Sequence, residues 1–288
     1  MSLNRLVYYS AVISGWAAFL GWLLSEFFIL RRGTFGASME VGIIAGIVGA
    51  AIGAGLNLVS GMTNAQWKQQ LKRMAPGLIG GGIGGAAGGL VGNLLFTWLG
   101  LPRALGWMIM GVGIGVVEGL YEKSQSKIRN GLIGGTVGGL VGGFLFDPIV
   151  NLVASGSGMA SRATAFVILG VCIGAMIGLV QVVLKEAWLT VLDGYRPGRQ
   201  LIISQPETIL GRSDRHALPF LGEHNRDVEP DHLRIVRESD GHFAVEDNRT
   251  KLGTRVNGKP LQGKWRLSDG DVIQFGRNFV RFSERRRA

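Results

Sequence analysis

Side chains that could catalyse a reaction or bind a metal ion are few and widely spaced in this sequence. Its histidines follow one another at intervals of eight to ten residues, at His216, His224, His232 and His242. This is not the spacing of paired metal ligands on one helix or turn. Gly80 to Gly85 matches the pattern Gly-x-Gly-x-x-Gly, but no predicted strand precedes it, so a dinucleotide site is not expected. No pair of nucleophile and base can be assembled, and we expect no enzyme, no cofactor and no metal site.

Polar side chains inside the apolar part of the chain are the next candidates, because such residues are costly in lipid and often functional. Glu118 and Asp147 each lie near the end of an apolar segment, where they could simply reach water. Asn93 corresponds to Asp147 when the sequence is shifted by 54 residues. Two polar residues at one height could bond across a helix bundle or line a vestibule. No acidic residue with a basic partner is expected at mid-membrane, which argues against a coupled transporter.

The composition divides the chain into two regions with different surroundings. Residues 1–198 hold 39 of the 47 glycines, whereas the last 90 residues hold 17 of the 30 Lys/Arg and 13 of the 20 Asp/Glu. This division predicts a membrane region followed by a soluble region. The net charge of +10 does not indicate nucleic-acid binding, since no basic stripe with interleaved aromatic residues is present.

Six apolar segments are long enough to cross the roughly 30 Å hydrocarbon layer of a bilayer. They are Leu6–Leu30, Val41–Ser60, Gly77–Leu99, Ala104–Leu120, Gly131–Val153 and Thr164–Leu184. Basic residues gather in the loops after the second and fourth segments, and fewer lie on the other side, among them Arg31 and Arg32. The positive-inside rule then places both termini in the cytoplasm of a multi-pass protein in the plasma (inner) membrane.

The glycines of these segments recur at every fourth position. The run GLIGGGIGGAAGGLVG from Gly77 is repeated as GLIGGTVGGLVGG from Gly131. A strip without side chains allows a neighbouring helix to approach closely. We therefore expect three parallel helical hairpins, the first one diverged, that pack through Gly81, Gly85, Gly89, Gly131, Gly135, Gly139 and Gly143. Whether the bundle is also a homo-oligomer is left open by the sequence.

From residue 199 onwards the pattern changes to short runs with a period of two, separated by Gly, Asp and Asn. Such runs without helices predict an all-β sandwich. The expected organisation is a six-helix transmembrane domain at 1–190, a linker at 191–198 and a cytoplasmic β-sandwich domain at 199–288. The basic segments around Trp67, from Tyr121 and from Lys185 are expected at the cytoplasmic membrane surface.

Four motifs in the last third resemble the forkhead-associated (FHA) domain family. They are TILGRS from Thr208, DHLRI around His232, GTRVNG from Gly253 and LSDGDVIQFG from Leu267. The resemblance covers about residues 199 to 286 and implies a β-sandwich whose loops bind a phosphothreonine peptide. A phosphate group requires a guanidinium and several fixed donors.

The resemblance assigns roles residue by residue. Arg212 is expected to contact the phosphate, and the partner-binding set is Arg212, Ser213, Thr250, Lys251 and Asn257. The structural set is His232, Gly253, Thr254 and Gly258. Two positions depart from the family: Glu229 replaces the phosphate-binding serine, and Leu252 replaces the asparagine that orients the peptide backbone. A carboxylate repels phosphate, although Lys251 is a nearby cation that could compensate.

Two functions follow from these patterns. The first is a membrane-anchored scaffold in kinase-linked signalling or complex assembly, whose partners are the lipid bilayer and a cytoplasmic protein, with or without phosphothreonine. The alternative is a glycine-zipper channel or permeation protein that its FHA-like domain regulates.

Overall fold

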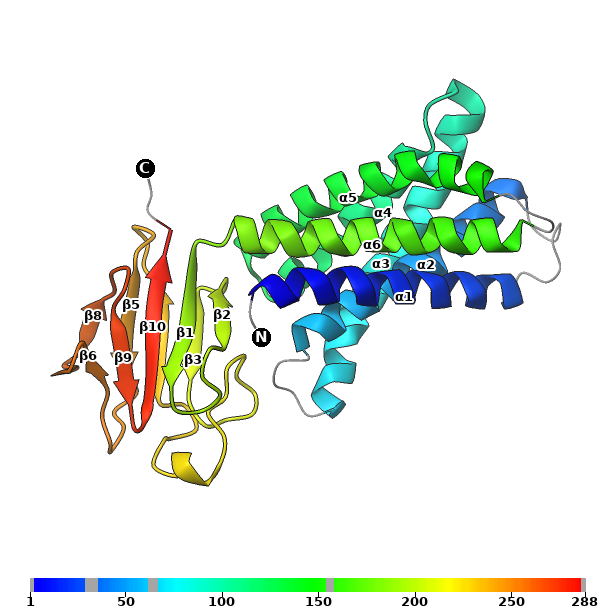
Figure 1. Ribbon diagram of the computed structural model, residues 1–288. Coiled ribbons are helices and arrows are strands. Elements are labelled where there is room, and N and C mark those ends of the chain that lie inside the picture. The colour runs from blue at the N-terminus through cyan, green and yellow to red at the C-terminus, as the bar shows by residue number, and fades with distance from the viewer. Residues whose placement is uncertain (1–2, 29–35, 62–66, 154–157, 286–288) are drawn as a thin grey trace. The chain divides into compact units, whose positions relative to one another are not determined.

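The computed structural model describes residues 3–28, 36–61, 67–153 and 158–285, which form a helical unit and a β-sandwich unit (Figure 1). Chain contacts divide the two units between Leu184 and Lys185. Six apolar helices followed by a β-sandwich are therefore the fold class of the described residues, as the sequence predicted. Arg31 and Arg32 lie outside the described residues.

The helical unit consists of six helices joined by short connections, each long and apolar enough to cross a membrane. They are α1 (Leu3–Phe28), α2 (Ala37–Gly61), α3 (Trp67–Leu99), α4 (Ala104–Tyr121), α5 (Gln125–Leu152) and α6 (Met159–Val183). The basic segment at Trp67 and most of the one that follows Tyr121 form the first turns of α3 and α5.

Two glycine faces place α3 between α2 and α4. On one face, Gly81 lies against the backbone carbonyl of Gly49, and Gly77 lies against that of Gly53 in the same way. On the other face, Gly84 lies against the backbone of Gly113. A side chain at these sites would collide with the neighbouring backbone, so the helix axes are held close together.

The same arrangement recurs around α5. Gly131 and Gly135 face the carbonyls of Gly115 and Gly111 in α4, while Gly138 faces Ile173 in α6. All seven glycines that were expected to pack helices lie at such contacts: those of α3 contact α2, and those of α5 contact α4.

The first helix closes the bundle into a ring. Gly170 and Gly174 of α6 lie against the α1 backbone at Ser14 and Ser10, and Gly21 of α1 lies against Val48 of α2. Small residues of α1 thus occupy the place that glycines hold in α3 and α5. Apolar side chains fill the interior of the ring, among them Val48, Ile52, Met110, Ile114, Leu169 and Ile173, all at most 4% exposed.

The sandwich unit contains two antiparallel sheets. Its strands are β1 (Ala187–Asp193), β2 (Gln200–Ile203), β3 (Glu207–Leu210), β4 (Leu233–Arg237), β5 (Phe243–Asp247), β6 (Arg255–Val256), β7 (Lys259–Pro260), β8 (Lys264–Arg266), β9 (Val272–Phe275) and β10 (Asn278–Glu284). One sheet has the order β2-β1-β10-β9-β6-β7 and the other β3-β4-β5-β8. Alternate side chains of both sheets and Phe220 from the connection between β3 and β4 form one core, whose largest members also include Leu189, Leu210, Phe275 and Phe282.

The prediction of a surface segment from Lys185 and a linker at 191–198 is wrong. Residues Ala187–Asp193 form β1, which pairs with both β2 and β10 near the middle of the larger sheet. The run Trp188 to Leu192 combines aromatic, apolar and β-branched residues, which favour strands, and its side chains alternate between the core and the surface. The rest of the expected linker is the turn between β1 and β2, where the Gly198 N–H donates to the Val191 carbonyl at 2.8 Å.

We expect Gly81→Ala to destabilise the helical unit by about 1–3 kcal/mol, because the new methyl group would overlap the Gly49 carbonyl. The matched control is Gly82→Ala on the same helix, where a methyl group would lie 3.5 Å from Ala50 Cβ, an ordinary contact. Unfolding of the purified full-length protein in detergent, followed by circular dichroism, measures the difference. Equal stability of the two variants would contradict the close approach of α2 and α3.

Candidate functional site

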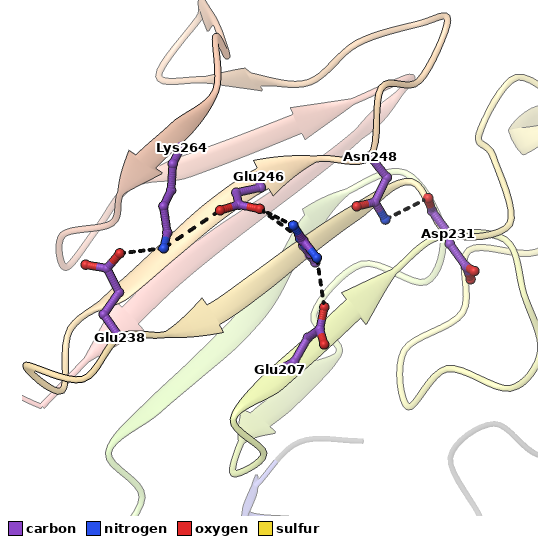
Figure 2. Close-up of polar contacts among 7 residues, drawn as sticks. Glu207, Asp231, Glu238, Glu246, Asn248 and Lys264 are labelled. Carbon is purple, nitrogen blue, oxygen red and sulfur yellow. Dashed lines mark hydrogen bonds and ion pairs between the residues drawn. The ribbon is translucent and has the colours of Figure 1, made fainter.

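Two loops at the same end of the sandwich carry most of the residues that the motifs identified. The first, residues 211–232, connects β3 to β4, and the second, residues 248–254, connects β5 to β6. The Asn248 side chain donates to the Asp231 carbonyl at 3.0 Å (Figure 2), and the Asn248 N–H donates to the His232 carbonyl at 3.0 Å. The two loops are thus joined by hydrogen bonds and can present their side chains to one ligand.

His232 is the buried centre of this junction. Its Nδ1 accepts the Glu229 N–H at 3.2 Å, so the neutral ring carries its proton on Nε2. That nitrogen faces the Gly253 carbonyl at 3.4 Å and Thr250 Oγ1 at 3.3 Å. Burial lowers the pKa of His232 below its ordinary value. His232 therefore connects Glu229 of the first loop to Thr250 and Gly253 of the second loop.

Asp247 accepts several hydrogen bonds from residues of the second loop. Its carboxylate accepts the Thr250 N–H at 2.7 Å, the Thr250 hydroxyl at 2.9 Å and the Thr254 hydroxyl at 2.6 Å. Thr250 was expected to bind the partner, but its single hydroxyl hydrogen is directed to Asp247 and is not available to a phosphate. The Gly253 N–H in turn donates to Thr250 Oγ1 at 3.1 Å. Thr250, Gly253 and Thr254 therefore shape the loop from inside.

Arg212 begins the first loop and is held there by its backbone. Its N–H donates to the Glu229 carbonyl at 2.9 Å, and the Ser213 N–H donates to the Pro230 carbonyl at 3.1 Å. The Arg212 side chain is exposed. Among the described residues it has no hydrogen-bond or ion-pair partner, and the same holds for the exposed side chains of Arg215, Arg249 and Lys251. These four residues are called the loop cations below.

The outer face of the smaller sheet shows the opposite pattern. Arg234 lies between Glu207 and Glu246, with N–O distances of 3.6 Å and 2.6 Å. Lys264 lies 2.7 Å from Glu238 and 3.8 Å from Glu246. Figure 2 shows these contacts running across the strands. Cations on this face are therefore neutralised by acids, whereas the loop cations are not.

The two departures from the motif differ in what they contact. Glu229 turns its carboxylate to the second loop, where Oε1 accepts the Lys251 N–H at 3.1 Å. A negative group of the protein itself thus uses one of the loop's amide donors. Leu252 is 47% exposed and presents an apolar surface where a hydrogen-bonding side chain was expected from the motif.

Asn257 was also expected to bind the partner, but its side chain is engaged within the domain. It donates to Asp271 at 2.8 Å and accepts the Val272 N–H at 2.9 Å. Its φ of +52° and the φ of +78° at Gly258 are left-handed, which the tight turn between β6 and β7 requires. The Asn257 side chain therefore positions the start of β9.

Sequence reasoning missed two contacts that hold the first loop. His216 Nε2 lies 2.8 Å from Asp231 and 2.9 Å from the Pro230 carbonyl. The buried Asn278 amide donates to Asn225 Oδ1 at 2.8 Å. Each contact joins residues more than ten positions apart, and of these residues only Asp231 belongs to a motif, DHLRI.

Several polar residues of the helical unit are paired with one another. Lys127 lies 2.8 Å from both Glu118 and Glu122. Asn93 donates to Ser38 at 2.9 Å, and Asp147 lies 3.7 Å from Arg103. Within the described residues, no group of three or more His, Cys, Asp or Glu is placed to hold a metal ion.

A family model described as FHA domain matches residues 208–276. Similar solved structures include one from a study of phosphothreonine-dependent FHA domain interactions, with 27% identity, 35% of this chain and 98% of that chain covered, and a TM-score of 0.31. A Synechocystis sp. protein is 25% identical over 35% of this chain and 98% of that chain, with a TM-score of 0.30. Mycobacterium tuberculosis EmbR, in complex with a low-affinity phosphopeptide, is 14% identical over 99% of this chain and 72% of that chain, with a TM-score of 0.30. No curated protein matches the chain.

We expect the sandwich unit, residues 185–288, to lose stability as the pH falls below about 6.5, the ordinary pKa of histidine. The folded state keeps His232 neutral, whereas the unfolded state binds a proton at this residue. Lowering the pH therefore stabilises the unfolded state relative to the folded state. Urea unfolding at pH 7, 6 and 5 measures this loss. In His232→Gln the loss over this interval should shrink, whereas the exposed control His224→Gln should retain it. An unchanged pH dependence in His232→Gln would contradict this role.

Proposed function

Residues 208–276 are an FHA domain, and we propose that this domain binds a protein partner for a scaffold anchored in the plasma membrane by the six helices. The partner is a cytoplasmic protein that carries phosphothreonine, and the setting is kinase-linked signalling or complex assembly. The proposal assigns the chain a binding role and no catalytic step.

The loop cations carry this proposal. Arg212 and Arg215 on the first loop and Arg249 and Lys251 on the second are exposed and lack acidic partners among the described residues. Unpaired cations on two joined loops form a positive surface, which attracts an anionic group and raises the rate of encounter. Of the four, Arg212 follows the β3 strand most closely, and its guanidinium can contact two oxygens of one phosphate.

The Glu229 carboxylate, which lies beside the second loop, opposes the binding of a phosphate group there. It already accepts the Lys251 N–H, a donor that a phosphate oxygen would otherwise use, and two negative groups repel each other. We therefore propose that Glu229 lowers the affinity for phosphothreonine and increases the share of binding that comes from other contacts. The exposed Leu252 side chain is suited to such a contact because it is apolar.

The helical unit supports membrane anchoring by the length and composition of its six described helices. Basic residues near the start of α5 and the end of α6, such as Lys123, Arg129 and Lys185, favour a cytoplasmic sandwich under the positive-inside rule. We do not propose a permeation pathway, since Ile52, Met110, Ile114 and Ile173 fill the interior of the helix ring.

We expect Glu229→Ser to raise the affinity of the full-length protein for phosphothreonine peptides at least tenfold, because it removes a like charge and frees the Lys251 amide. Titration of a phosphothreonine peptide library, with unphosphorylated twins, into detergent-solubilised protein measures the effect.

The complementary variant is Arg212→Ala, which should weaken phosphopeptide binding at least tenfold. Arg281→Ala on β10 is the matched control, since Arg281 is equally exposed and lies on a strand of the other sheet. If wild-type and Glu229→Ser proteins both bind phosphorylated and unphosphorylated peptides equally, the phosphate part of the proposal fails.

A further inference from the structure

The six helices line a partly open cavity of about 240 Å³ at the end of the helical unit remote from Val183, where α6 ends. Its wall includes the last turns of α1 at Trp22 and Glu26, the first turns of α4 at Trp107, and the first turns of α6 at Arg162 and Phe166. This space is called the distal cavity. We infer that the distal cavity binds a small amphipathic ligand with an apolar body and an anionic head that accepts hydrogen bonds.

The apolar body follows from the size and lining of the cavity. An apolar cavity of about 150 Å³ is known to hold a benzene molecule, so this space can take a ring or a short alkyl segment. Trp107, Phe146 and Phe166 form a cluster along the wall, with ring centroids 5.0–5.8 Å apart. Aromatic rings in this arrangement provide edges and faces for a further ring.

The accepting head follows from three unsatisfied donors. The indole nitrogens of Trp22 and Trp107 and the Nε of Arg162 are buried and have no hydrogen-bond partner among the described residues. All three side chains belong to the cavity wall. Buried indole and guanidinium N–H groups normally find an acceptor, and neither group can accept a hydrogen bond itself. The missing group is therefore an acceptor.

The unpartnered Nε–H of Arg162 favours an anionic acceptor. Arg162 uses Nη2 for Glu26, at 3.1 Å, and its Nε remains without a partner. Arg103, also in the wall, lies 4.2 Å from the centre of the Phe96 ring. Arg103 in turn pairs with Asp147 at 3.7 Å, so each of the two guanidinium groups has one carboxylate partner. A carboxylate head is favoured over an ammonium head because the remaining Arg162 N–H can form a charge-assisted hydrogen bond to a carboxylate, whereas an ammonium group has no lone pair to accept one.

The cavity ends inside the bundle. Met110 and Ile173, which are fully buried, belong to the apolar cluster that fills the ring. A ligand can thus be held at the distal end without passing through. Such a ligand can be a carboxylic lipid from the bilayer or a free aromatic carboxylate, and both offer the same chemistry. The inference concerns the helical unit alone and does not depend on the proposed binding of phosphothreonine by the sandwich.

Calorimetric titration of the full-length protein in detergent tests this inference with three probes, each of which contains a phenyl ring and a different head group. Benzoate carries an anionic acceptor, benzyl alcohol a neutral head and benzylamine a cationic one. We expect benzoate to bind at least tenfold more tightly than benzylamine, with benzyl alcohol between them. Equal affinity for benzoate and benzylamine, or no binding of benzoate by protein freed of lipid, would overturn the inference.

Trp22→Phe and Trp107→Phe test the donors directly, because each keeps a ring and removes one N–H. Each should weaken benzoate binding about tenfold, the effect of one hydrogen bond to a charged group. The matched control is Trp98→Phe, because Trp98 is 80% exposed and not part of the wall. Circular dichroism confirms that each variant is folded. Unchanged benzoate affinity in both folded variants would contradict the role of the indoles.

Mass spectrometry of protein purified from membranes separates the two sources of the ligand. A fatty acid that copurifies and is displaced by benzoate assigns the site to a lipid. A lipid-free protein that binds benzoate assigns it to a soluble carboxylate.

Discussion

Direct contact between helix backbones is the constraint on which the helical unit depends. Where Gly135 of α5 meets Gly111 of α4, a carbonyl oxygen occupies the space of a side chain. Hydrophobic burial cannot hold helices together when lipid surrounds them, whereas close packing can. The close approach also leaves little space between neighbouring helices. Bulky residues therefore lie either in the centre of the ring, such as Met110 and Ile173, or exposed on its outside, such as Trp16 and Phe144. Gly88 and Gly92 of α3, which lie against Gly106 of α4, also form part of the wall of the distal cavity.

Much of this fold could be predicted because its signals are periodic. Apolar length identified the six helices, and a period of two identified the sandwich from β2 onwards. The strand β1 was missed for a physical reason. Its sequence directly follows an apolar helix, and the pairing that makes it a strand comes from β10, about ninety residues later along the chain. The ring closure by Ser10 and Ser14 of α1 was equally hidden, since serine does not continue the glycine pattern.

At the candidate site, the motifs could locate residues along the chain, but they could not show which groups each side chain contacts. Arg212 and His232 could be located from the sequence because each adjoins a recognisable strand, Arg212 just after β3 and His232 just before β4. The sequence could not show that the hydroxyl of Thr250 is directed to Asp247, or that Asn257 is engaged by Asp271. Hydrogen-bond competition of this kind depends on distances between loops. The same limit applies to Glu229, whose contact with the Lys251 amide spans 22 residues.

The place of β10 in the larger sheet determines the order in which the sandwich can be assembled during translation. β1 and β2 leave the ribosome first, yet in this sheet only β10 connects them to β9, β6 and β7. Until β10 has emerged, this sheet exists as two fragments with exposed edges. Domains generally fold as units during synthesis, and here that unit is incomplete until its last strand is available.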